Sequence, residues 1–362
     1  RKLLMRVVRK GIGTLQAVGL EGAPYQREQA ALERDNSWFL SKDLREKDVA
    51  SWFALCARLY EAVRAAEVSP DDERRRSKTL ELLEKALERG EARKPNEPRD
   101  SLVSDVDVDA RWSMHERGKK VFVGYKEQIA TDEANEIITA AEVTPGNVDD
   151  KVMLEGLVDE HEANTSEPPE AAAADSGYSS GPNREKLEER QITDYVAPPT
   201  PKGHKRGEFS ATDFEPEFDD DGTPLRVRCP AGQVAEGGRW RESDEGWTFY
   251  FKQGQCKGCP FAPRCTKAKR GRSVFISKYF SLQASARARA RSPDFAQAQI
   301  ERLGIERTFA YKQRRCGLKR TWYRGLQRVR VQVFVACFMV NVVRITSGSR
   351  ASPKVGQSGG ET

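Results

Sequence analysis

The chain has 362 residues, 38% of them hydrophobic, so it is long enough for two domains and can bury one substantial core. It lacks the run of about 20 apolar residues that a membrane-spanning helix needs, and its seven cysteines are an odd number, so we expect a cytoplasmic protein, neither membrane-bound nor a secreted disulfide framework. The net charge of +6 hides a basic segment, residues 266–344, with 19 lysines and arginines against three acidic residues. Such a segment indicates a polyanion such as nucleic acid as partner, although a solvated helix surface has the same composition.

Residues 1–92 follow a helical pattern, in which Trp52, Leu55 and Leu59 belong to an apolar stripe. Two prolines at 93–99 predict a linker, so a helical region with its linker is expected at 1–100. The chain begins with Arg1 inside an apparent helix, and we expect that the start of the natural protein is missing.

Both strands and helices are predicted between residues 121 and 345. Alternating apolar residues predict two strands joined by a polar turn, and the run Ala171–Ala174 predicts a short buried strand that presents Asp175 at its end. The predicted strands are 121–129, 137–143, 171–174 and 191–197, and the predicted helices are 149–162, 183–189, 282–313 and 321–345.

Four cysteines have the spacing of metal ligands. Cys256 and Cys259 form a C-x-x-C pair on a glycine turn, Cys265 follows six residues later, and Cys229 precedes an apparent hairpin around 240–250. Tetrahedral zinc takes four such ligands, so the pattern predicts a structural Zn²⁺ site. Four reduced cysteines packing a small module are the alternative.

Carboxylates are the second group of candidate ligands, because Mg²⁺ and Mn²⁺ prefer carboxylate oxygens from separate elements. Asp175 and Glu306 are the best candidates, although a salt bridge would also explain Glu306. Asp105, Asp107 and Asp109 would share one face of a strand, where one of them could ligate metal. Asp132 and Asp150 are also available, at positions where turns and helix starts favour aspartate.

The basic segment interleaves cations with aromatic residues, such as Trp322 and Tyr323. Cations of this kind contact phosphates without reading sequence. By charge, the predicted DNA contacts are Lys312, Arg315, Lys319, Arg320 and Arg324.

With these residues the sequence resembles the DDE-type insertion-sequence transposases whose ribonuclease-H-like core carries a cysteine-bearing insertion. The resemblance covers about 100–345 and is carried by SDVDVDAR at 104–111, GYKEQIATDEANEIITAAEVTPGNVDD at 124–150, ADSGY at 174–178, CKGCPFAPRCT at 256–266 and IERTFAYKQRRCGLKRTWYRGLQRV at 305–329.

The resemblance implies an α/β fold with a ribonuclease-H-like mixed sheet flanked by helices, a small cysteine-rich insertion and an N-terminal helical region. The core would begin at 101–200, the loop and cysteine-rich insertion would occupy 201–272, the basic helical remainder of the core 273–345, and a disordered tail 346–362. The implied activity is DNA cleavage and strand transfer with two Mg²⁺ or Mn²⁺ ions, by a homodimer or larger assembly acting at the bacterial nucleoid.

In the family pattern Asp175 would be the second catalytic carboxylate and Glu306 the third. The motif that commonly carries the first is not found in residues 1–100. Asp107 is therefore the best candidate, with Asp109 next, unless the residue lies upstream of the chain. Two further readings stay open, a catalytically incomplete DNA-binding remnant and a metal-dependent nuclease of the same fold.

Overall fold

The computed structural model describes residues 2–20, 22–34, 42–88, 102–114, 121–201 and 203–347. The chain divides into two compact units, each described below by itself. The first comprises residues 1–128, 141–148 and 311–343, and the second comprises 129–140, 149–310 and 344–362. The linker expected at 93–99 and residues 348–362 of the expected tail lie outside the described residues.

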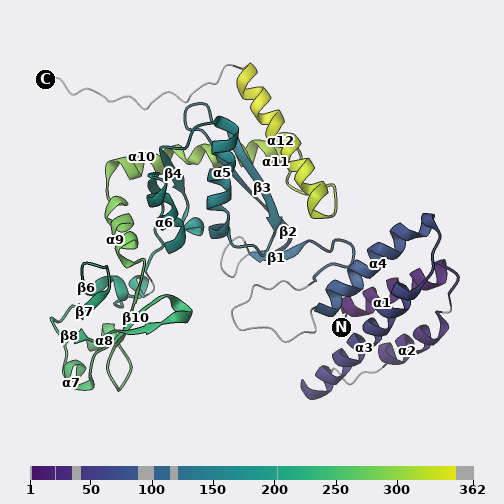
Figure 1. Cartoon of the computed structure of the whole chain (residues 1–362), viewed down its shortest axis with the longest axis horizontal. Coiled ribbons are helices and arrows are strands. Elements are labelled where there is room, and N and C mark those ends of the chain that lie inside the picture. The colour runs from purple at the N-terminus through teal and green to yellow at the C-terminus, as the bar shows by residue number, and fades with distance from the viewer. Residues whose placement is uncertain are drawn as a thin grey trace. The chain divides into compact units, whose positions relative to one another are not determined.

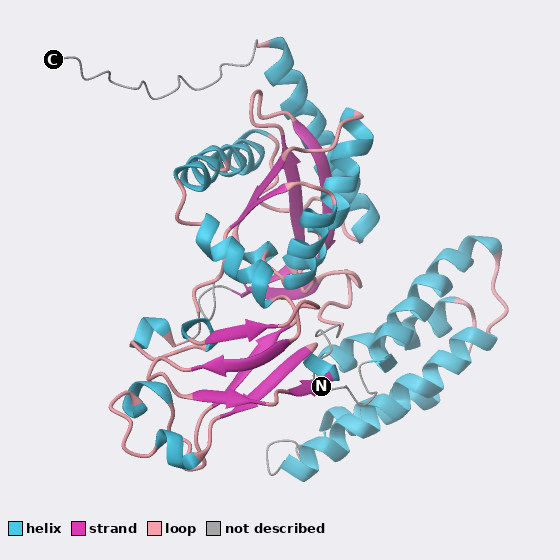
Figure 2. Ribbon diagram, turned by 60° about the vertical axis from the view of Figure 1, so that its left-hand side comes forward, coloured by secondary structure: helices cyan, strands magenta, loops and turns pink. Residues whose placement is uncertain are grey.

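The N-terminal residues form a helical bundle, which confirms the helical prediction there (Figures 1 and 2). Its helices are α1 (Lys2–Ala17), α2 (Ala23–Arg34), α3 (Lys42–Ala65) and α4 (Pro70–Glu88). Apolar residues three or four apart on α1, α3 and α4 face one core, in which Trp52, Leu55 and Leu59 are fully buried. Pro70 begins α4 because proline lacks the N–H that the first turn of a helix leaves unpaired.

A three-stranded sheet follows in the order β1-β2-β3 (Figure 1). Its strands are β1 (Arg111–Met114), β2 (Val121–Thr131) and β3 (Ile138–Pro145). Strands β1 and β2 are antiparallel, with Arg111 opposite Gly124. Between β2 and β3 the Asp132 carboxylate accepts the backbone N–H groups of Asn135 and Ile137, so the predicted strand–turn–strand is confirmed.

The second unit contains a β-α-β segment with two parallel strands. Its elements are η2 (Asp150–Val152), α5 (Leu154–Thr165), β4 (Ala171–Ala174), η3 (Ser176–Tyr178), α6 (Gly181–Glu189) and β5 (Thr193–Val196). Ala171 pairs with Thr193 and Ala174 with Val196. Strand β4 is only partly buried, with Ala171 exposed, so the prediction of a buried strand is wrong: with β5 it forms a sheet of only two strands.

Residues 203–278, hereafter the cysteine module, form two small antiparallel sheets with the orders β6-β7-β8 and β11-β10-β9. The strands are β6 (Glu215–Phe218), β7 (Pro224–Arg228), β8 (Val234–Glu236), β9 (Arg239–Arg241), β10 (Gly246–Tyr250) and β11 (Ser273–Ser277), and the short helices are α7 (Gln253–Cys256) and α8 (Ala262–Cys265). Phe214, Val227, Phe249 and Ile276 form its buried core. The predicted hairpin is the pair β9–β10.

Four helices end the described chain: α9 (Phe280–Arg289), α10 (Pro293–Glu301), α11 (Leu303–Arg315) and α12 (Leu326–Thr346). The continuous helix predicted at 282–313 is wrong. Ser292 has extended backbone and its side chain caps the N-terminus of α10, while Pro293 occupies the first turn, so one helix ends and another begins there.

Helix α12 is less buried than its apolar sequence predicts. Val329, Val333 and Val340 are buried, but Val331 and Phe338 are more than half exposed. By length and composition alone α12 is long and apolar enough to cross a membrane. Core helices of soluble proteins have the same properties, so this helix does not indicate a membrane location.

The α/β class is confirmed, since parallel and antiparallel strands alternate with helices in the described residues. The strands of these residues belong to four separate sheets, so the single ribonuclease-H-like mixed sheet stays a prediction.

Candidate functional site

Asp175 lies at the carboxyl end of β4, where the resemblance predicts a catalytic carboxylate. Its side chain is exposed and caps η3, with Oδ1 accepting the Gly177 N–H at 2.7 Å. Carboxyl ends of parallel strands are common positions for binding groups in α/β folds. Asp175 is therefore accessible, and Oδ2 has no hydrogen-bond partner among the described residues.

Asp150 brings a second carboxylate to the same place. A Cβ atom placed on Gly177 would lie 2.9 Å from Asp175 Oδ1 and 3.3 Å from Asp150 Oδ2, so the two side chains flank this glycine. Burial raises the pKa of the neighbouring Tyr178 hydroxyl, and the negative charges of Asp150 and Asp175 raise it further. The sequence offered Asp150 as a further candidate at a position where turns and helix starts favour aspartate, but its nearness to Asp175 depends on folding.

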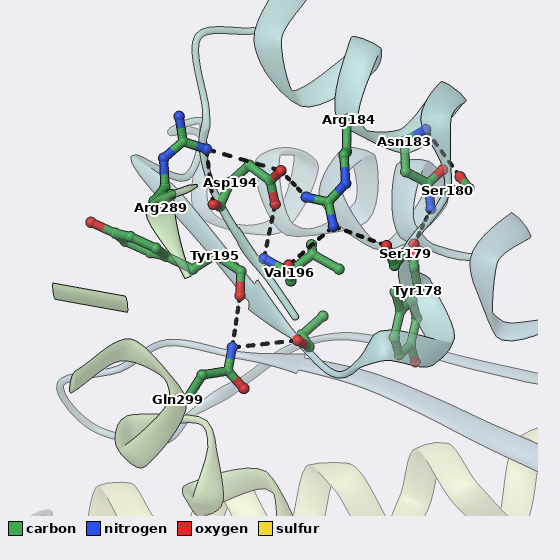
Figure 3. Close-up of polar contacts among 11 residues, drawn as sticks. Tyr178, Ser179, Ser180, Asn183, Arg184, Asp194, Tyr195, Val196, Arg289 and Gln299 are labelled. Carbon is green, nitrogen blue, oxygen red and sulfur yellow. Dashed lines mark hydrogen bonds and ion pairs between the residues drawn. The ribbon is translucent and has the colours of Figure 1, made fainter. Parts of the chain in front are cut away.

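Asn183 holds the segments of these two carboxylates together. Its side-chain amide donates to the carbonyl oxygen of Lys151, next to Asp150, and to that of Tyr178, each at 2.7 Å. Figure 3 shows Asn183 and Tyr178 in this region. These two hydrogen bonds hold η2 next to η3. The backbone, rather than any contact between the two carboxylates, therefore keeps Asp150 close to Asp175.

A buried ion pair between Arg184 of α6 and Asp194 of β5 adjoins this region (Figure 3). Arg184 also donates to Ser179 Oγ at 2.9 Å and to the Val196 carbonyl at 3.3 Å. The guanidinium therefore connects α6, the segment after η3 and the end of β5.

Glu306 is linked to the strand of Asp175 by hydrogen bonds through Gln299 and by an ion pair with Arg302. The Gln299 amide donates to the carbonyl oxygens of Tyr195 at 2.7 Å and Ala174 at 3.4 Å (Figure 3). Arg302 donates to Gln299 Oε1 at 3.1 Å and lies 3.6 Å from Glu306 Oε1. The Glu306 side chain is 65% exposed, so the ion pair with Arg302 leaves its carboxylate open to solvent.

Asp107 and Asp109 have structural partners. Asp107 accepts hydrogen bonds from the Tyr125 hydroxyl and, at 3.2 Å, from the Gly325 N–H. Asp109 accepts from the Leu326 N–H and from Lys85, each at 2.9 Å. Carboxylates in these positions stabilise the N-terminus of α12, whose first N–H groups have no partner within the helix.

The segment of these aspartates is also not the predicted strand, since residues 104–110 form bends. Asp105 pairs with Arg6 at 2.8 Å and with Lys10 at 3.3 Å. Each of the three aspartates therefore binds a cation, a hydroxyl or a backbone N–H group of the protein. The contacts of Asp107 with Tyr125 and Gly325 give it a structural role.

The loop 316–325 between α11 and α12 displays most of the predicted DNA contacts. Arg315, Lys319, Arg320 and Arg324 are exposed, and none forms an ion pair with another described residue. Trp322 beside them is 73% exposed. Lys312 differs, because it is fully buried and pairs with Glu127, so it is not available to a phosphate and we remove it from the predicted DNA contacts.

The four cysteines of the predicted zinc site line one small cavity of about 30 Å³ in the cysteine module. They come from the end of β7 (Cys229), the C-terminus of α7 (Cys256), the following turn (Cys259) and the C-terminus of α8 (Cys265). Gly258 has φ of +77°, which glycine adopts without strain and which closes the C-x-x-C turn.

The cysteines act on one another electrostatically. Burial raises the pKa of the Cys265 thiol, Arg272 opposes this shift, and Cys256, Cys229 and Cys259 add to it. Within the described part of the chain, however, no three histidine, cysteine, aspartate or glutamate side chains are arranged closely enough to hold a metal ion as they stand. The cysteines share a cavity without forming a closed coordination group.

A family model matches the C-terminal part of the chain. Residues 228–346 match the family model described as Transposase DDE domain, a range that includes the four cysteines and Glu306 but not Asp175. Neither the curated proteins nor the solved structures contain a match to the chain. Residues 228–346 are thus similar to the transposase DDE domain, in agreement with the resemblance that the sequence predicted.

Proposed function

We propose that this protein is a DDE-type transposase that cleaves and joins DNA phosphodiester bonds with divalent metal ions, and that its carboxylate site is centred on Asp175. The observation that carries the proposal is the pair of carboxylates, Asp150 and Asp175, both of which approach the Cβ position of Gly177. The hydrogen bonds from Ala174 through Gln299 to Arg302, and the ion pair of Arg302 with Glu306, support Glu306 as the third member.

These residues fit Mg²⁺ or Mn²⁺ by their chemistry, because hard cations prefer carboxylate oxygens supplied by separate elements. Asp150 comes from η2, Asp175 from the end of β4, and Glu306 from α11. Bound divalent ions would supply charge stabilisation for the attacking and leaving oxygens. Asp107 is left out, since its carboxylate already binds Tyr125 and Gly325.

In the proposed reaction, a water oxygen attacks phosphorus at the element end, losing a proton as the bond to the 3′ oxygen breaks and that oxygen gains one. The freed 3′ hydroxyl then attacks a target phosphodiester, releasing another 3′ hydroxyl. Arg315 at the end of α11 and Lys319, Arg320 and Arg324 of the loop 316–325 would hold phosphates, as their exposure allows. Joining two element ends would require at least two copies of the protein.

The test is Mg²⁺- or Mn²⁺-dependent cleavage of labelled element-end DNA. Asp150→Ala, Asp175→Ala and Glu306→Ala should each lower the cleavage rate by at least a hundredfold while DNA binding persists. Asp149→Ala is the matched control, because Asp149 is exposed, pairs only with Lys151 on the surface and precedes Asp150 in sequence. Cleavage unchanged in Asp175→Ala would contradict the proposal.

Two other activities predict different products in the same experiment. A DNA-binding remnant would bind the DNA without cutting it in either metal. A nuclease of the same fold would cut the DNA and never join the 3′ end to a target. Joined product is therefore the decisive observation for transposition.

We also propose a structural Zn²⁺ in the cysteine module, held by Cys229, Cys256, Cys259 and Cys265. Four thiolates are a donor set suited to zinc, and their shared cavity supports the assignment. Purified protein should contain one zinc per chain by elemental analysis. Cys259→Ser should lose it, whereas Cys316→Ser, outside the module, should retain it; equal zinc content in both variants would contradict the site.

A further inference from the structure

The cysteine module has a basic surface separate from the loop 316–325. Between Gly246 and Pro293 the chain has eleven lysines and arginines and no acidic residue. Five of these cations are exposed near the cysteine cavity and are hereafter called the module basic surface: Lys252, Lys257, Lys267, Lys269 and Arg270.

Two segments separated in sequence by residues 258–266 come together to make this surface. The Phe251 N–H donates to the Arg272 carbonyl at 2.8 Å, and a Cβ atom placed on Gly271 would lie 3.2 Å from the Lys252 carbonyl carbon. Residues on both segments line the cysteine cavity, among them Cys256 and Thr266. Lys252 therefore lies near Arg270 in the structure, and Lys257 and Lys267 directly follow the cavity-lining residues Cys256 and Thr266.

The five cations form no ion pair with the described residues. Other cations of the same stretch are already engaged: Lys278 pairs with Glu245 at 2.6 Å, and Arg264 donates to the Gly207 carbonyl at 2.7 Å. Glu208, whose charge interacts with Lys267, is itself paired with Arg206 at 2.7 Å. The positive charge of the module basic surface is thus left for an external partner.

We propose that the module basic surface binds the phosphate backbone of duplex DNA, as a contact additional to the loop 316–325. The proposal rests on DNA being the substrate of this transposase. Flexible exposed cations neutralise phosphates without a shaped pocket, and each contact releases counterions. The exposed ring of Phe261, between the two segments, adds apolar area beside these cations.

The test measures the affinity of the full chain for duplex DNA by fluorescence anisotropy at several salt concentrations. Calcium replaces magnesium, so that binding is separated from cleavage. The triple variant Lys267→Gln, Lys269→Gln, Arg270→Gln should bind at least tenfold more weakly. The slope of log Kd against log salt should fall by about 2 to 3, since each lost phosphate contact contributes about 0.9.

A matched control removes three positive charges elsewhere in the module. Arg226→Gln, Arg228→Gln, Arg239→Gln changes exposed residues of β7 and β9, two of which pair with Glu217. This variant should change the slope by less than about 1. A second variant, Lys252→Gln with Lys257→Gln, should lower the slope by about 2 if the two segments act together.

Unchanged slopes in both test variants would overturn the proposal. A loss of DNA affinity and of slope in the control variant equal to that in the triple variant would overturn it as well. Tighter binding of the wild type to duplex RNA, with the larger loss there, would overturn it in favour of RNA. Cleavage by the same preparations in magnesium reports separately on the proposed function, so the failure of one does not imply failure of the other.

Discussion

Arg184 and Asp194 form a buried ion pair behind the candidate site, with side chains that are only 3% and 10% exposed. Without Arg184, the buried Asp194 carboxylate would keep only the more distant Arg289, at 4.0 Å, as a counter-charge, and a buried charge that loses its close partner is costly. Arg184→Met should therefore lower the free energy of unfolding by about 3–5 kcal/mol, as measured by urea denaturation. Arg190→Met is the control, because Arg190 pairs with Asp159 and Glu162 nearer the surface and should cost about 1 kcal/mol or less. An equal loss of unfolding free energy in the two variants would contradict the prediction that burial makes the Arg184 ion pair more costly to break.

Asp109 should contribute to stability in a pH-dependent way. Burial acts to raise its pKa, but hydrogen bonds from the Leu326 N–H and Lys85 outweigh burial, and the folded-state pKa is lowered. A lowered pKa stabilises the folded state above the unfolded-state value of about 3.9, and this stability is lost as pH falls through the folded-state pKa. Asp109→Asn should thus cost about 1 kcal/mol at neutral pH and much less at pH 2. Thermal melts over this pH range measure the difference, and a constant loss at every pH would contradict the assignment.

Gly271 should be irreplaceable in the cysteine module. Its φ is +105°, and an added Cβ would lie 2.1 Å from the Phe251 carbonyl oxygen. Gly271→Ala should therefore disrupt the strand ends next to the cysteine cavity and expose the module to proteolysis. Gly232→Ala separates backbone strain from the clash, since Gly232 has φ of +78° and open space around its Cβ position. Gly232→Ala should lower the free energy of unfolding by only about 1–2 kcal/mol. If both variants are equally sensitive to protease, the backbone near Gly271 shifts to remove the clash, and the prediction is wrong.

The sequence predicted the local elements better than their ends and partners. Alternation located β2 and β3, and the small residues of Ala171–Ala174 located β4, because these signals lie within a few residues. The break at Ser292 was missed, although a serine before proline is a common helix start, because the apolar pattern continues on both sides of it.

The candidate site was predictable only in part for a physical reason. Asp175 and Glu306 were predicted from the resemblance and a local pattern, and they stay predictions. Asp150 was undervalued because its nearness to Asp175 requires the fold of η2 and η3. Lys312 was misassigned because its charge resembles that of its exposed neighbours, while Glu127, its partner, lies 185 residues earlier.

Gln299 provides the sharpest test of how the site is held together. Its amide binds the Tyr195 and Ala174 carbonyls at the ends of β5 and β4, and its oxygen accepts from Arg302, which approaches Glu306. Gln299→Leu should preserve DNA binding and lower the cleavage rate on the order of ten- to a hundredfold, because small misplacements of catalytic groups are costly. The control is Gln297→Leu on the same helix, where Gln297 bonds only to Glu301 at the surface.

A purely structural role for Gln299 would give a different result. Loss of stability alone would lower cleavage and DNA binding together, in proportion to the fraction of unfolded protein, and cooling the reaction below the melting transition would restore both. A positioning role predicts a slower cleavage step at saturating DNA and metal, at a temperature where circular dichroism shows the variant to be fully folded. If Gln299→Leu cleaves at the wild-type single-turnover rate under those conditions, Gln299 does not position Glu306 relative to the strand of Asp175. That result would contradict the proposed arrangement of the three carboxylates.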